Sequence, residues 1–267
     1  MTKEPPIVVP SAEGGAGTGT VSRALALLTL LADAGGTVSV KHVGDVMQVP
    51  PSTAHRMLQL LRKEGFVDAV AGGQYGIGPQ FYRVAARVMA GKSPVAMAQP
   101  VIEAIAEAFN ETVLFGLYLP TEGAMSFAAR ADGQQKLKYQ IDMHTPLSVV
   151  WGASGKSVLA FLPPEEASRI LAAEGPSPVT GAMPPDAARL AVELEQVRVR
   201  GWAMSESEKL PDARGIAAPV FGPTGVIGCI CLTSPKARMP HSSTDAIGVE
   251  VSKRAKALSH DLGADFK

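Results

Sequence analysis

The stretch PPSTAHRMLQLL, residues 50–61, decides the fold of the amino-terminal part of this chain. Its two prolines end the segment before them, because each lacks a backbone N–H and fixes φ. Ser52 or Thr53 is expected to cap a helix over Ser52–Glu64, since a short side-chain oxygen can accept from a free amide at a helix start. Apolar residues recur at the spacing of one helix face: Ala54, Met57, Leu58 and Leu61.

The other face of this predicted helix carries polar side chains that suit nucleic acid: Ser52, His55, Arg56, Gln59 and Arg62. Arg and Gln make paired hydrogen bonds to base edges in a major groove, and hydroxyl or imidazole groups bind phosphate oxygens. Taken alone, the pattern equally describes an ordinary amphipathic helix with a solvated face. The flanking sequence decides between the two interpretations.

Upstream, two further helices are indicated by apolar residues at helical spacing: Val21, Leu25, Leu28 and Leu31 in the first, and Val40, Val43 and Met47 in the second. The first ends at Gly35-Gly36, and the gap from the second to Pro50 has the length of a helix-turn-helix turn. Downstream, Gly65 ends the Ser52–Glu64 helix. Two strands, Phe66–Val70 and Gln74–Ile77, then flank a glycine turn. This order predicts a winged helix-turn-helix, whose third helix is the recognition helix.

Residues 21–80 resemble the amino-terminal domain of the IclR (isocitrate lyase regulator) family of bacterial transcription factors. Three runs carry the resemblance: Ser22-Arg23-Ala24-Leu25, Ser52-Thr53-Ala54-His55-Arg56 and Tyr75-Gly76-Ile77-Gly78. The similarity extends over about residues 20–260, and it implies a GAF-like effector-binding domain in the second half. The matching residues there are Gly155–Ala160, Leu162-Pro163, Arg198–Gly201, Trp202, Arg214 and Ile216–Val220.

The residue pattern of the second half indicates an α+β domain with a largely antiparallel sheet. Two hairpins are predicted, Thr112–Leu119 with Met125–Arg130 and Gly215–Phe221 with Val226–Thr233. Leu137–Met143 is expected to be extended. Helices are predicted over Val95–Asn110, Ser154–Leu162, Glu165–Ala173, Pro185–Arg200 and Ser242–Leu262, the last with Ile247, Val251, Ala255 and Leu258 inward.

We divide the chain into a mobile tail (residues 1–20), the winged helix-turn-helix (21–78), a linker helix (79–92) and an effector-binding domain (93–262). The tail is rich in Pro, Gly, Thr and Ser and shows no period. The linker helix places Phe81, Val84, Ala85 and Val88 on one side. It is either a dimer contact, as the resemblance implies, or an internal packing helix.

Composition describes a soluble globular protein, with 46% apolar and 19% charged residues among 267. No apolar run approaches the roughly 20 residues of a membrane span, and no secretory signal is visible. We therefore expect a cytoplasmic protein. The 25 basic residues equal the 25 acidic ones, which argues against general polyanion binding. Residues 21–90 carry seven basic and four acidic side chains, a difference of +3, so useful DNA binding is expected only from a homodimer or a dimer of dimers.

Gly155-Lys156-Ser157 ends like a nucleotide-binding P-loop. A P-loop needs a glycine five residues before Gly155, where this chain has Val150, and no apolar strand ending in a magnesium-binding Asp follows. Nucleotide hydrolysis is therefore disfavoured, and no cofactor is expected. The predicted helix start would still offer free N–H groups over Ser154–Ser157 to an anion such as a carboxylate.

No catalytic or metal-binding constellation is apparent. The five histidines lack metal-ligand spacing, and the nucleophile motifs of hydrolases are missing. Cys229 and Cys231 alternate in an apolar strand, where we expect them on opposite faces with at least one in the core. An enzyme with a DNA-binding-like head is the alternative to a ligand-responsive transcription regulator, and it would have to act through the Gly-Lys-Ser segment or the cysteines.

On DNA, two recognition helices are expected in successive major grooves of a pseudo-palindrome. Arg56 and Gln59 are expected to reach bases or the phosphates beside them. Other residues are expected to position the helix or to touch the backbone and minor groove: Ser52, Thr53, His55, Arg62, Gly73, Gln74 and Tyr75.

The resemblance also implies which residues line the effector pocket. Carried over position by position, they are Ala153, Ser154, Gly155, Ala213, Gly215, Cys231 and Thr233. The Leu147–Gly155 segment is longer than the family pattern, so Val149 and Trp151 are added, and Ser205 is kept as a further candidate. Small residues at 213 and 215 and the Trp151 ring predict a small organic acid larger than two- or three-carbon acids, such as an aromatic acid. Its carboxylate is expected between the amides of Ser154 and Gly155 and the Thr233 hydroxyl.

Overall fold

The computed structural model describes residues 19–89, 91 and 93–265. The chain divides between Gly91 and Lys92 into two compact units. The predicted tail over residues 1–20 lies almost wholly outside the described residues. Within the described ranges, no helix is long and apolar enough to cross a membrane.

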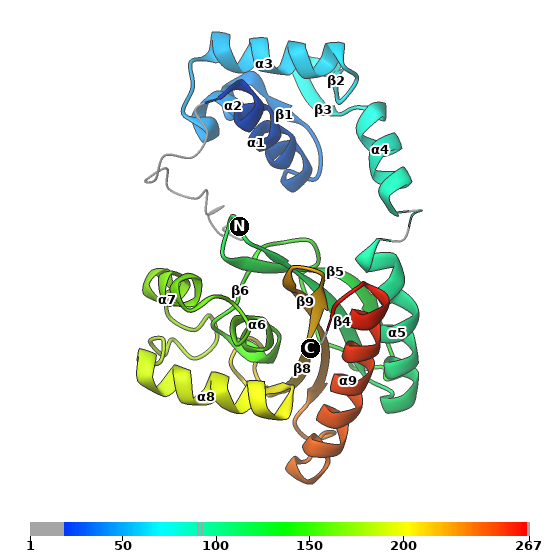
Figure 1. The fold of residues 1–267 in the computed structure, drawn as a ribbon. Helices are drawn as coiled ribbons and strands as arrows, with labels where there is room; N and C mark the ends of the chain where they lie inside the picture. Colours follow the sequence, from blue (N-terminus) through cyan, green and yellow to red (C-terminus); the bar gives the residue numbers. More distant parts are fainter. Residues whose placement is uncertain (1–18, 90, 92, 266–267) are drawn as a thin grey trace. The chain divides into compact units, whose positions relative to one another are not determined.

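The first unit is a three-helix core with a small wing and a fourth helix, as the upper part of Figure 1 shows. The wing is an antiparallel sheet of order β1-β3-β2. The core side chains of Leu27, Leu31, Val43 and Leu58 are fully buried. The elements are α1 (Thr20–Asp33), β1 (Val38–Ser39), α2 (Val40–Met47), α3 (Pro51–Lys63), β2 (Val67–Val70), a short turn (Ala71–Gly73), β3 (Gln74–Ile77) and α4 (Pro79–Met89).

The turn between α2 and α3 is tight because of its local backbone. Ser39 Oγ accepts from His42 N at 3.1 Å and starts α2, and Gln48 ends it in the left-handed region at φ 52°. A side chain at Gly44 would meet the Val49 carbonyl oxygen at 3.1 Å. Glycine at this position therefore lets α2 approach the residues that lead into α3.

Two details of the helix prediction were wrong. Helix α3 begins at Pro51 with Pro50 as N-cap, and no side chain caps it. A proline at the first helical position loses no hydrogen bond and has a suitable φ, so Ser52 and Thr53 lie inside the first turn. In α1, Val21 and Leu25 are 73% and 60% exposed. Apolar side chains occur on more than one face of this leucine-rich helix. The face that packs against the core carries Leu27, Leu30 and Leu31.

The second unit is a six-stranded antiparallel sheet of order β6-β5-β4-β9-β8-β7, covered by helices on both faces (Figure 1). Helices α5 and α9 lie on one side and α6, α7 and α8 on the other. This arrangement confirms the predicted α+β class. The elements are α5 (Pro94–Phe109), β4 (Thr112–Leu119), β5 (Ala124–Ala131), β6 (Leu147–Ser148), α6 (Gly152–Leu159), α7 (Pro164–Ala173), α8 (Ala187–Arg200), β7 (Ala203–Glu206), β8 (Ala213–Gly222), β9 (Gly225–Pro235) and α9 (His241–Asp261).

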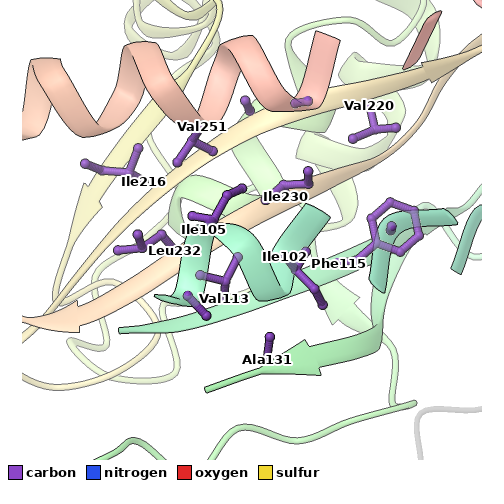
Figure 2. Close-up of a cluster of buried hydrophobic side chains, with 14 of the residues drawn as sticks. Ile102, Ile105, Val113, Phe115, Ala131, Ile216, Val220, Ile230, Leu232 and Val251 are labelled. Carbon is purple, nitrogen blue, oxygen red and sulfur yellow. The ribbon is translucent and has the colours of Figure 1, made fainter. Parts of the chain in front are cut away.

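Alternation along the strands builds one core on each face of the sheet, because successive strand side chains point to opposite sides. Figure 2 shows the core under α5 and α9, where Ile105 and Val251 meet strand residues such as Val113 and Ile230. The predicted inward set of α9 is confirmed, since Ile247, Val251, Ala255 and Leu258 are all buried. The opposite core, under α6, α7 and α8, contains Leu114, Met125, Ala217, Cys229 and Cys231.

The predicted placement of the two cysteines was therefore wrong. Residues two apart in a strand share a face, so Cys229 and Cys231 lie together in the α6-side core while Ile230 points to the other core. Within the described residues, Leu137–Met143 forms no strand of the sheet. Ser205 and Glu206 belong to strand β7, whose partners are Gly215 and Arg214 of β8.

Candidate functional site

The outward face of α3 carries basic and polar side chains that the rest of the first unit does not use. Ser52, His55, Arg56 and Arg62 are exposed. The guanidinium groups of Arg56 and Arg62 make no hydrogen bond or ion pair with any described residue. Such free guanidinium groups can contact phosphates or the acceptor atoms of guanine.

Gln59 is held in place by the wing. Its Nε2 donates to the Tyr75 hydroxyl of β3 at 3.0 Å and lies 3.3 Å from Nε2 of His55. Tyr75 itself is only 7% exposed, so its ring belongs to the core. The structure thus places Tyr75 as a residue that positions Gln59, whereas the sequence interpretation had put Tyr75 at the DNA surface.

The tip of the wing is a glycine turn. Gly72 and Gly73 adopt φ values of 78° and 72°, a region that favours glycine. Gly73 is exposed and Gln74 is partly exposed. The backbone of this turn is therefore exposed and open to a binding partner.

The second unit contains a cavity of about 450 Å³ between the sheet and the start of α6. Its walls come from β4, β5 and β9, from the β7–β8 turn, and from the segments around residues 141 and 176. Eight of the ten residues predicted for the effector pocket line it: Trp151, Ala153, Ser154, Ser205, Ala213, Gly215, Cys231 and Thr233.

Val149 and Gly155 do not line the cavity. The Val149 side chain is fully buried in the α6-side core. A side chain at Gly155 would lie 2.6 Å from the Val149 backbone, so Gly155 serves the close approach of α6 to the segment before it. Gly155 had been carried over from the family pattern and Val149 had been added because of the longer Leu147–Gly155 segment, and both residues lie behind the cavity wall.

The start of α6 already holds an anion from the protein. The helix begins at Gly152, so Gly155, Lys156 and Ser157 lie beyond its open amides. Gly152 N donates to Glu208 Oε2 at 2.8 Å, and Ala153 N donates to Ser205 Oγ at 2.7 Å. A carboxylate does sit at the helix N-terminus, where the macrodipole favours it, but it belongs to Glu208.

Lys156, the lysine of the P-loop-like segment, has a structural role. It is 5% exposed, and its Nζ lies 2.7 Å from Glu193 Oε1 and 2.8 Å from Glu208 Oε1. Two carboxylates already neutralise this lysine, so it is unsuited to binding a phosphate. Its ion pairs instead fix Glu208 against α6.

Lys209 lines the cavity and was missed by sequence analysis. Its Nζ donates to the Ser148 carbonyl oxygen at 2.6 Å, and its methylenes lie against Gly152. Burial lowers the Lys209 pKa to about 8. No periodic pattern marks this residue, because it lies in the turn between β7 and β8.

The two cysteines are free thiols in the core. Burial raises both pKa values, that of Cys231 to about 11, so neither is a thiolate near neutral pH. Among the described residues, no group of three His, Cys, Asp or Glu side chains could hold a metal ion. The two thiols are therefore unsuited to act as nucleophiles near neutral pH.

Comparison with known proteins gives matches along nearly the whole chain. Residues 20–71 match the IclR helix-turn-helix domain, and residues 89–260 match the bacterial transcriptional regulator IclR C-terminal domain. The transcriptional regulator BhcR of Paracoccus denitrificans is 28% identical over 94% of this chain and 90% of its own length. The transcriptional repressor IclR of Escherichia coli is 24% identical over 91% of this chain and 90% of its own.

Solved structures agree on the fold. An IclR transcriptional regulator from Silicibacter sp. TM1040 has a TM-score of 0.84 at 26% identity, covering 93% of this chain and 98% of its own. An IclR homolog from Microbacterium hydrocarbonoxydans, complexed with 4-hydroxybenzoate, has a TM-score of 0.73 at 18% identity, covering 91% and 99%. The exposed helix face, the cavity and both domain matches lead to one conclusion: the chain belongs to the IclR family of DNA-binding transcriptional regulators with a carboxyl-terminal effector-binding domain, and it is not an enzyme.

Proposed function

We propose that this protein reads operator DNA through the outward face of α3 and senses a small organic acid in the cavity beside α6. The observation that carries the DNA part is the exposed guanidinium of Arg56, which has no partner among the described residues. Gln59 lies one helical turn further along the same face and is held by Tyr75. We place the protein in the cytoplasm, where operator DNA is accessible.

The reading unit acts as a homodimer or a dimer of dimers. On α4, Tyr82 and Val88 are 64% and 59% exposed in the single chain, and a second copy would bury them. Two copies would also double the phosphate contacts of a unit whose net charge is only +3. Both arguments support a linker helix that serves as a dimer contact.

The cavity supports an effector with a sizeable apolar body. A volume of about 450 Å³ is roughly fifteen times the ~30 Å³ that one water occupies in the liquid. A two- or three-carbon acid would leave most of this space to water. Phe127 and Trp151 offer aromatic walls, and the 4-hydroxybenzoate bound by the Microbacterium homolog supports an aromatic acid. Ser154 and Thr233 also line the cavity, and their hydroxyl groups can hydrogen-bond to polar groups of the ligand.

A gel-shift titration of Arg56→Ala on a fragment of the protein's own upstream region tests the DNA assignment. Loss of an arginine that pairs a guanine should weaken binding by about 1–3 kcal/mol per half-site. Arg189→Ala, which removes an exposed arginine of α8 in the second unit, is the control and should bind like the native protein. Unchanged affinity and salt dependence in Arg56→Ala would show that the reading face lies elsewhere.

The effector part is tested by thermal shift of the full-length protein against aliphatic and aromatic acids. An acid that stabilises the protein should also change its affinity for the operator fragment. Failure of every acid to stabilise the protein would contradict the organic-acid proposal and leave the DNA assignment standing.

A further inference from the structure

Lys209 is the one basic side chain among the described residues that line the cavity. Its ammonium has three N–H donors, and one of them is used by the Ser148 carbonyl oxygen at 2.6 Å. A carbonyl neutralises no charge. The ammonium therefore enters the cavity wall with donors to spare and without a carboxylate in ion-pair contact among the described residues.

The two acidic side chains that act on Lys209 are already engaged. Glu208 places one carboxylate oxygen 2.8 Å from Lys156 Nζ and the other 2.8 Å from Gly152 N. Glu174 accepts from Ser148 Oγ at 2.7 Å. Glu208 cannot turn to Lys209 without leaving the buried Gly152 amide unpaired, which is costly, and Glu174 makes no ion pair with Lys209. The protein thus leaves this cation to be neutralised from inside the cavity.

A second polar group in the wall is also unsatisfied. Ser207 Oγ is buried and has no hydrogen-bond partner in the described structure, and Ser207 lines the same cavity. Most of the remaining wall near the sheet is apolar, including Leu114, Phe127 and Ile141. The cavity wall therefore combines several polar groups with a larger apolar surface.

The acidic groups limit how much negative charge the cavity can accept. Asp142, Glu174 and Glu208 line it together with the single cation, Lys209. A second carboxylate on a ligand would find no further cation among the described lining residues and would face these acidic side chains, which repel a like charge. Lys209 can neutralise one carboxylate of a ligand, but the described lining residues offer no cation for a second carboxylate.

We infer that the cavity selects monocarboxylates, with Lys209 as the counter-ion of the ligand carboxylate and Ser207 as a hydrogen-bond partner beside it. This inference rests on the proposed acid-sensing function and specifies it. Lys209 distinguishes an acid from its neutral amide, and the acidic lining distinguishes a monoacid from a diacid of similar size. The low Lys209 pKa, about 8, agrees with an ammonium whose partner is supplied by the ligand.

The test is isothermal titration calorimetry on the full-length protein with two matched sets of probes. The aromatic set is benzoate, phthalate and benzamide, and the aliphatic set is hexanoate, adipate and hexanamide. At pH 7 we expect the monoacid of at least one set to bind at least tenfold more tightly than its diacid and its amide.

Lys209→Met keeps the length of the side chain and removes its charge. In this variant the monoacid should lose its advantage over the amide. Lys236→Met, which removes a lysine outside the cavity, is the matched control and should keep the native preference. Ser207→Ala should weaken the monoacid by a smaller factor than Lys209→Met.

The outcomes separate the two proposals. Acid binding that Lys209→Met leaves unchanged, or diacids that bind as well as monoacids, would overturn the present inference while acid sensing stands. Native protein that binds the amides more tightly than the acids, or none of the six probes, would overturn both.

Discussion

At the residue scale, Lys209 carries a charge that its surroundings oppose. Burial lowers its pKa to about 8, while the carboxylates of Glu174 and Glu208 act in the other direction. The folded state therefore releases this proton at a lower pH than the unfolded chain, whose lysines titrate at about 10.4. Stability contributed by this residue should rise as pH increases from about 8 toward 10.4, because the unfolded state then binds more protons.

Lys209→Met should consequently stabilise the ligand-free protein near neutral pH. Removing a buried charge that lacks an ionic partner should gain about 1–2 kcal/mol at pH 7, less the loss of the contact to Ser148. Urea unfolding at pH 7 and pH 9.5 measures the effect, and the gain over native protein should shrink at the higher pH. An equal difference at both values would mean that Lys209 is not the titrating group.

At the element scale, the packing of α9 against the rest of the second unit depends on the absence of a side chain at Gly248. A Cβ on Gly248 would lie 2.3 Å from two atoms of the Trp202 ring, and Trp202 is 4% exposed. Hydrophobic periodicity predicted the inward stripe of α9 but gave Gly248 no part in it. The close contact exists because a tryptophan far away in sequence lies against this turn of the helix.

Gly248→Ala should push α9 away from the core and destabilise the second unit. Overpacking of this kind should cost about 1–3 kcal/mol, which exceeds the gain in helix propensity from glycine to alanine. Val249→Ala, at a neighbouring position that is 63% exposed, should change stability little. Thermal unfolding of the two variants compares them, and an unchanged midpoint for Gly248→Ala would mean that the indole moves aside without cost.

At the scale of the whole molecule, charge is balanced overall but not along the chain. The 25 basic and 25 acidic residues cancel, while residues 21–90 carry an excess of three basic side chains. Attraction to DNA is therefore local and weak for one copy. The proposed homodimer would restore affinity by adding a second set of phosphate contacts.

Operator binding should accordingly depend on both half-sites. The slope of log affinity against log salt is about −0.9 per neutralised phosphate, so a duplex with two half-sites should give about twice the slope of a duplex with one. Fluorescence anisotropy between 50 and 200 mM salt, about the range over which such losses are large, measures both slopes. Equal slopes would indicate that a single copy makes all the contacts.

The sequence by itself determined the elements whose signal is local. Helices α2 and α3, the wing strands and strands β4, β5, β8 and β9 follow from apolar spacing and from glycine and proline turns, and the order of these elements determined the winged helix-turn-helix. The same spacing identified the outward face of α3. The sequence also indicated eight of the residues that line the cavity, but only through comparison with the pattern of a known family.

Only the tertiary structure decided which groups meet in the cavity. Glu208 binds the start of α6 across 56 residues of sequence, and Lys209 reaches Ser148 across 61. Periodicity reports which side of an element is apolar, not which distant turn will lie against it. For the same reason α1 could be assigned the wrong stripe, the turn that carries Lys209 showed no pattern, and the anion at the helix N-terminus proved to be a side chain of the protein itself.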